Sequence, residues 1–159
     1  MKTSKSIFLF VFLGSILLLG AAVYLQLVEK MLPCPLCILQ RYAFFVLAVC
    51  ALVGLFMPVG ADKVGATAAL LASFTGIGLA GWHLWIKAHP GLSCGIDPME
   101  ASLNMLPPAK ALPLLFQADG LCTTEYPPFL GLSIPMWSMI CFLIFSIALL
   151  TVLIRRRFR

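Results

Sequence analysis

Six cysteines carry the most reactive side chains in this sequence, and four of them lie outside its long apolar stretches. Cys34 and Cys37 are separated by two residues, which brings their sulfur atoms close enough for a reversible disulfide. Cys94 and Cys122 have 27 residues between them, in a region rich in proline. Two neighbouring dithiols can exchange electrons through a mixed disulfide. These four residues therefore predict thiol–disulfide chemistry.

The surroundings of Cys37 favour its thiolate form. Cys37 immediately precedes an apolar stretch, and at a helix start the unpaired N–H groups and the helix dipole stabilise negative charge. Arg41 follows four residues later, one turn along on the same helix face. An arginine within a membrane span is costly, so Arg41 is a candidate functional residue. The alternative is an anchor whose charged end reaches to the membrane interface.

The composition requires a membrane around these residues. The chain of 159 residues is 62% hydrophobic and only 11% charged, where a soluble domain has about 25% charged residues. Four stretches approach or exceed the ~20 apolar residues that cross a bilayer. We expect one all-α membrane domain over residues 1–159, a bundle of four transmembrane helices at residues 7–28, 38–57, 64–86 and 135–154.

The distribution of basic residues predicts the orientation of this bundle. The N-terminus, the connection at residues 58–63 and the C-terminal tail hold seven of the eleven Lys and Arg residues. We expect these regions, and both termini, to be cytoplasmic. Residues 29–37 and 87–134 then form loops on the opposite side, where all four cysteines would lie. Because the basic residues flank membrane spans, nucleic-acid binding is not expected.

The first and third spans each have a feature with two interpretations. Residues 7–28 could be mistaken for a signal peptide, but the apolar run is longer than such peptides use, and we expect it to be retained. In the third span, Ala72, Gly76 and Ala80 recur every four residues. That spacing indicates a smooth face for close helix packing.

The long loop should contain a short helix at the membrane interface. Asp97, Pro98 and Glu100 have the pattern of an N-cap, a proline at the first helical position and an early acidic residue. Pro107 and Pro108 should end this helix, and residues 109–116 are apolar enough to lie along the membrane surface. We expect the loop to pack on the bundle rather than to slide over it.

Two alternatives to exchange chemistry are open for the cysteines. A disulfide between Cys94 and Cys122 could be a structural link that closes the loop. A metal site of four cysteines is disfavoured because only one pair has the spacing usual for structural zinc, and we expect no metal. Cys50 and Cys141 lie among apolar residues, where a thiol behaves as a small hydrophobic group, and we assign them no role.

At this point the sequence resembles a known family, the bacterial disulfide bond formation protein B (DsbB) quinone reductases. The shared features are four helices, the segment 34–37 with its CPLC sequence followed by Gln40 and Arg41, the pair Cys94 and Cys122, and the segment 131–137 leading into the last helix. The resemblance spans nearly the whole chain.

The resemblance implies a function and a role for each site residue. A Cys94–Cys122 disulfide would reoxidise a periplasmic thioredoxin-fold oxidase like DsbA, with Cys94 forming the mixed disulfide. Electrons would then pass to the Cys34–Cys37 pair. Cys37 would be the thiolate against a bound quinone, ubiquinone or menaquinone, which Arg41 would help to hold. The protein would lie in the bacterial inner membrane.

The resemblance does not extend to the two histidines. His83 and His89 lie near the outer end of the third span, at about the depth of Arg41, and could contact a quinone or relay a proton. We expect both to be hydrogen-bonded residues at the membrane interface.

Three other functions compete with this one. Vitamin K epoxide reductases also combine a CxxC pair with loop cysteines, but there the CxxC follows the loop pair, whereas here Cys34 and Cys37 come first. A paralogue dedicated to one substrate would share all four cysteines. A non-enzymatic membrane scaffold stapled by cysteines would tolerate the loss of Arg41.

Overall fold

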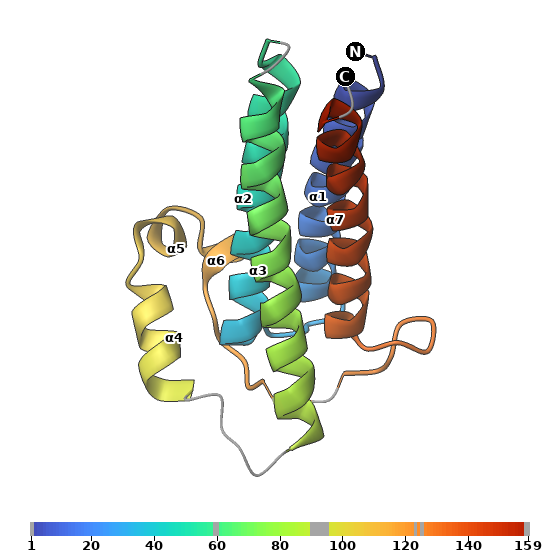
Figure 1. Ribbon diagram of the computed structural model, residues 1–159. Helices are drawn as coiled ribbons and strands as arrows, with labels where there is room; N and C mark the ends of the chain where they lie inside the picture. Colours follow the sequence, from blue (N-terminus) through green and yellow to red (C-terminus); the bar gives the residue numbers. More distant parts are fainter. Residues whose placement is uncertain (1, 59–60, 90–95, 123, 125, 158–159) are drawn as a thin grey trace.

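Four long helices form the body of the molecule, which we describe from a computed structural model (Figure 1). The structure describes residues 2–58, 61–89, 96–122, 124 and 126–157. The four helices are α1 (Lys2–Val28), α2 (Pro35–Phe56), α3 (Asp62–Ala88) and α7 (Ile134–Arg157). Each is long and apolar enough to cross a membrane, so the predicted bundle of four transmembrane helices is confirmed.

The helices are antiparallel neighbours along the chain. Figure 1 shows the start of α1, the end of α2, the start of α3 and the end of α7 at one end of the bundle. The start of α2 and the end of α3 lie at the other end, beside the long loop. The described cysteines of the two predicted loops, Cys34, Cys37 and Cys122, therefore lie at the same end of the bundle.

The second helix begins three residues earlier than the sequence indicated. We expected residues 29–37 to be a loop, but α2 begins at Pro35. The Cys34 side chain caps this helix by accepting a hydrogen bond from the backbone N–H of Cys37. Pro35, at the first helical position, has a backbone angle already suited to a helix and lacks only an N–H that would be unpaired there.

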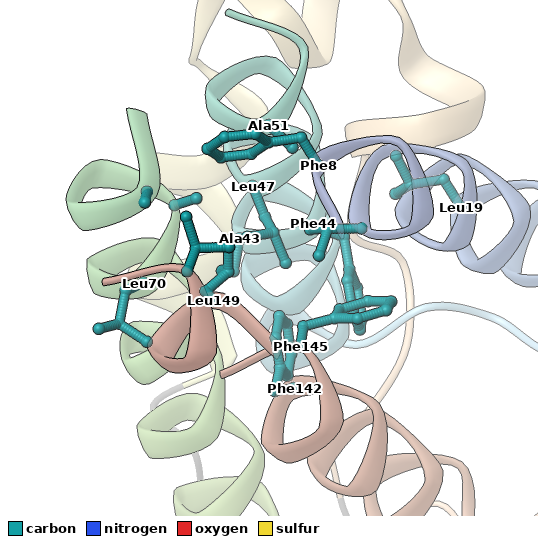
Figure 2. Close-up of a cluster of buried hydrophobic side chains, with 14 residues drawn as sticks. Phe8, Leu19, Ala43, Phe44, Leu47, Ala51, Leu70, Phe142, Phe145 and Leu149 are labelled. Carbon is teal, nitrogen blue, oxygen red and sulfur yellow. The ribbon is translucent and has the colours of Figure 1, made fainter. Parts of the chain in front are cut away.

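Aromatic rings and small residues fill the bundle interior (Figure 2). Phe44 of α2 stacks on Phe142 of α7, with ring centroids 3.9 Å apart. Gly76 of α3 lies so close to the Phe142 ring that a Cβ atom would overlap it. This contact agrees with the smooth face expected on α3. Ser73 adds a polar link between the helices, because its hydroxyl donates to the Phe142 carbonyl at 2.8 Å.

The described residues of the long loop form three short helices, where we expected one. These are α4 (Ile96–Asn104), α5 (Pro107–Ala111) and α6 (Pro113–Phe116). We expected Pro107 to end the first of them, but α4 ends at Asn104 and Pro107 begins α5 instead. The Asn104 side chain forms two hydrogen bonds with the backbone of Ala118, at 2.9 and 2.8 Å, which hold the chain in this turn.

The loop packs against the bundle, as expected. The α4 and α6 helices both contact α2. Leu103 is buried, and Phe116 is completely buried and stacks on Tyr42 of α2. Leu106 is exposed because the chain turns after Asn104.

Candidate functional site

The two cysteines at the start of α2 form a hydrogen-bonded thiol pair. Their sulfur atoms lie 2.9 Å apart, with Cys34 as donor and Cys37 as acceptor. The Cys37 N–H also donates to the Cys34 sulfur at 3.3 Å. Cys34 is buried, whereas Cys37 is half-buried. The short distance suits the predicted reversible disulfide, since oxidation requires only a small movement of two side chains.

The two sulfur atoms have different affinities for a proton. The pKa of the Cys34 thiol lies above its usual range, because its side chain hydrogen bonds to Cys122, then to Cys37, and because it is buried. In the hydrogen bond between the two sulfurs, Cys34 donates and Cys37 accepts. The role of Cys37 as the thiolate stays a prediction.

The loop residue Cys122 lies directly against Cys34. Both are buried in one small cluster with Leu36 and Ile86, and the Cys122 side chain is the largest cause of the raised pKa of Cys34. The contact joins a residue of the long loop to the cap of α2, which are 88 positions apart in the sequence.

Backbone contacts hold the Cys122 segment in this position. The N–H groups of Asp119 and Gly120 both donate to the Pro33 carbonyl, at 3.0 and 3.1 Å. Gly120 approaches the chain so closely that a Cβ atom there would lie 2.5 Å from the Leu32 carbonyl oxygen. Only glycine fits at this point, so the sequence fixes where the loop docks beside Cys34.

The predicted partner of Cys122 lies outside the described residues. Cys94 belongs to the segment 90–95, which the structure does not describe. The pairing of Cys94 with Cys122 therefore stays a prediction.

His83 faces the cysteines from α3, which the sequence did not indicate. It is 3% exposed, and its Nε2 atom lies 3.8 Å from the Cys34 sulfur. The Gln40 amide donates to His83 Nδ1 at 3.3 Å. His83 is thus hydrogen-bonded, as expected, and it is buried inside the site. His89 is the exposed one, and its Nδ1–H donates to the Trp85 carbonyl at 3.0 Å.

Arg41 is buried and turned inward, so it is not an anchor reaching toward the membrane surface. Its guanidinium donates to the Gln26 side-chain oxygen at 2.8 Å and to the Ala22 carbonyl at 3.3 Å, both on α1. It also donates to the carbonyls of Leu115 and Leu114 in α6, at 3.1 and 3.4 Å. One charged group therefore connects α1, α2 and the loop.

A pocket of about 410 Å³ brings these groups together. This volume is typical of small-molecule sites. Its walls are largely apolar and come from α1, α2, α3, α7 and the loop. The polar and reactive groups in its lining include Cys34, Cys37, Gln40, Arg41, His83 and Cys122.

Sequence reasoning missed three features of this site. His83 and Gln40 are in contact although they are 43 positions apart in the sequence. The only indication in the sequence was that His83 and Arg41 were expected at a similar depth in the membrane. Gln26, the acceptor for Arg41, gave no signal beyond being a polar residue in an apolar span. Cys50 and Cys141, to which we assigned no role, both pack against the apolar core, and Cys141 also lines the pocket.

Comparison with known proteins identifies the family. The family model described as "Disulfide bond formation protein DsbB" matches residues 4–152. The chain belongs to the DsbB family. It is 54% identical to the disulfide bond formation protein B of Herminiimonas arsenicoxydans, with 99% of each chain covered. The protein of the same name from Cupriavidus metallidurans is 42% identical, with 96% of this chain and 94% of the relative covered.

Family membership confirms the resemblance noted from the sequence. A third relative, from Ralstonia nicotianae, is 42% identical over 98% of both chains. The chain is therefore a multi-pass membrane oxidoreductase of disulfide bond formation. The non-enzymatic scaffold and the vitamin K epoxide reductase arrangement are set aside.

Proposed function

We propose that this protein takes two electrons from a periplasmic dithiol oxidase of the thioredoxin fold, like DsbA, and passes them through its two cysteine pairs to a membrane quinone. The observation that carries the proposal is the contact between Cys122 and Cys34. It links the loop pair to the pair at the start of α2.

The contact supports a specific exchange. The partner's dithiol attacks Cys94 of a Cys94–Cys122 disulfide, forms a mixed disulfide with Cys94 and releases Cys122. The Cys122 thiolate then attacks Cys34 of a Cys34–Cys37 disulfide. The Cys34–Cys122 bond forms, the Cys34–Cys37 bond breaks, and Cys37 leaves as a thiolate.

The remaining steps restore the loop disulfide and leave the other pair reduced. The partner's second thiol attacks the mixed disulfide, so the partner leaves oxidised and Cys94 is released as a thiolate. Cys94 then attacks Cys122, which re-forms the loop disulfide and returns Cys34 to the thiol. The dithiol of Cys34 and Cys37 now holds the two electrons that the partner lost.

The pocket fits a quinone as the acceptor of these electrons. Its apolar walls suit a lipid-soluble ring, and Cys37 and Arg41 line it together. The guanidinium has five N–H donors and can hydrogen bond to an oxygen in the pocket. When bound, a quinone supplies a two-electron, two-proton acceptor. Cys37 would face it as the thiolate, and Arg41 would orient it; the pocket does not distinguish ubiquinone from menaquinone.

The distribution of charge supports the orientation. Basic residues gather at the end of the bundle that holds the start of α1 and the end of α7, and cytoplasmic segments carry such an excess. Both termini would then lie in the cytoplasm of a bacterium, and the cysteine site would face the periplasm. That compartment is kept oxidising by a relay of this kind.

A direct assay tests the proposal. The purified protein, given a reduced thioredoxin-fold partner and a soluble quinone analogue, should reduce the quinone, and Cys37→Ser should abolish turnover. Cys50→Ser is the matched control, because Cys50 packs in the core away from the pocket. Turnover that survives Cys37→Ser would contradict the proposal. A strain lacking the gene would show whether many disulfides depend on the protein or only those of one substrate.

A further inference from the structure

We propose that the reduced dithiol of Cys34 and Cys37, together with His83, forms a binding site for a thiophilic divalent cation of the zinc class. The two sulfur atoms and one ring nitrogen all lie within 4.8 Å of one another. Thiolate and imidazole are the ligands that zinc prefers. The ion would be a reversible ligand of one redox state rather than a resident cofactor.

The geometry suits three protein ligands with one open position. In a tetrahedral zinc site, two thiolates lie about 3.8 Å apart and a thiolate and an imidazole nitrogen slightly closer. The Cys34 sulfur already lies 3.8 Å from His83 Nε2, and the two sulfurs are 2.9 Å apart. Binding therefore requires the sulfurs to separate by about 1 Å, which side-chain rotation can supply.

The ligands come from two helices that pack firmly against each other. Cys34 and Cys37 are fixed by the start of α2, and His83 lies on α3. Cys34 and His83 are both almost fully buried. The pocket that contains all three is also lined by Lys87 and Tyr126, which are half-buried, and by Thr124, which is exposed.

Gln40 gives the site a support for its histidine. A histidine that binds a metal through Nε2 carries its proton on Nδ1 and donates it to an oxygen. The buried Gln40 amide already lies 3.3 Å from Nδ1, with its nitrogen toward the ring. Rotation of the amide by half a turn would place its oxygen beside Nδ1, and the Gln40 side chain would keep the same shape. A bound zinc ion would take the place of the proton in the hydrogen bond from the Cys34 sulfur to the Cys37 sulfur.

Binding should depend on redox state because a disulfide offers no thiolate. The oxidised protein has neither sulfur ligand, and a bound ion would block oxidation of the dithiol. A consequence, which rests on the proposed function, is that zinc should inhibit quinone reduction reversibly. The binding itself does not depend on that function and can be measured without quinone or partner.

The test is a zinc titration of the purified full-length protein in detergent, against a chromophoric chelator. We expect one Zn²⁺ per reduced chain and none at this site in the oxidised chain. Substitution with Co²⁺ should give the absorption of a tetrahedral site with two thiolates. The comparison of redox states needs no variant, so it stands even if a substitution impairs folding.

Variants then assign the ligands. His83→Gln should weaken binding about 100-fold. Gln40→Glu, whose carboxylate can only accept from Nδ1–H, should tighten it about tenfold or more, and Gln40→Leu should weaken it by a similar factor. The double variant Cys94→Ser with Cys122→Ser should keep the site. Equal affinity in the oxidised protein, no effect of His83→Gln, or loss of binding in the double variant would each overturn the proposal.

Discussion

At the scale of single residues, Arg41 places a positive charge one turn from Cys37 and also connects α1, α2 and the loop. The sequence predicted the charge but not the connection. Its position one turn after Cys37 predicted a charge near the thiolate. Its acceptors could not be predicted, because Gln26 and the carbonyls of Leu114 and Leu115 come from distant parts of the chain. Packing of whole elements decides such contacts, and no local pattern records them.

The role of Arg41 leads to a kinetic prediction. Arg41→Ala should raise the KM for a quinone analogue about tenfold or more, which is the usual worth of one hydrogen bond to a charged group. Arg41→Lys should give an intermediate KM, because lysine keeps the charge but lacks the planar fork of donors. His89→Ala, outside the pocket lining, is the control. An unchanged KM for Arg41→Ala would exclude contact with the quinone.

At the scale of elements, the sequence predicted the spans better than their ends. Apolar length and the absence of charge located all four long helices. The start of α2 was placed three residues too late, because the capping role of the Cys34 sulfur depends on a geometry that hydropathy does not register. The loop was harder still, since Asn104 ends α4 through bonds to Ala118, 14 residues away.

Docking of the loop depends on one glycine. In Gly120→Ala, the new methyl group would press on the Leu32 carbonyl and push Cys122 away from Cys34. We expect the rate of quinone reduction by the reduced partner to fall about 10- to 100-fold, as small misplacements of reacting groups can cause. The KM for quinone should not change. Gly20→Ala, which meets no atom within 4 Å, is the control. An unchanged rate would show that this contact does not position Cys122.

Close packing of α3 against α7 depends on a second glycine, Gly76. Gly76→Ala should lower the free energy of unfolding by about 1 to 3 kcal/mol, the usual cost of overpacking, because its methyl group overlaps the Phe142 ring. Gly78→Ala on the same helix meets no atom within 4 Å and should cause no loss. Unfolding in mixed detergent measures both. Equal losses for the two variants would contradict the close packing of α3 against α7.

At the scale of the whole molecule, the bundle brings a loop cysteine and a membrane-edge cysteine together at one end. The sequence indicated that all four cysteines share a side of the membrane, from charge distribution alone. It could not indicate which loop cysteine meets which partner. The structure brings Cys122 against Cys34, and His83 approaches from α3 because that helix packs beside α2.

The contact between Cys122 and Cys34 can be tested by asking whether the two thiols form a disulfide, which they can do only if their sulfur atoms lie close together. A variant with Cys37→Ser and Cys94→Ser retains these two thiols at the site, and it would be treated in native membranes with a mild oxidant. Peptide mapping without reduction should find a Cys34–Cys122 disulfide in nearly every molecule. If both thiols instead stay reduced and react separately with a maleimide after unfolding, the proposed route from the loop to the quinone pocket is wrong.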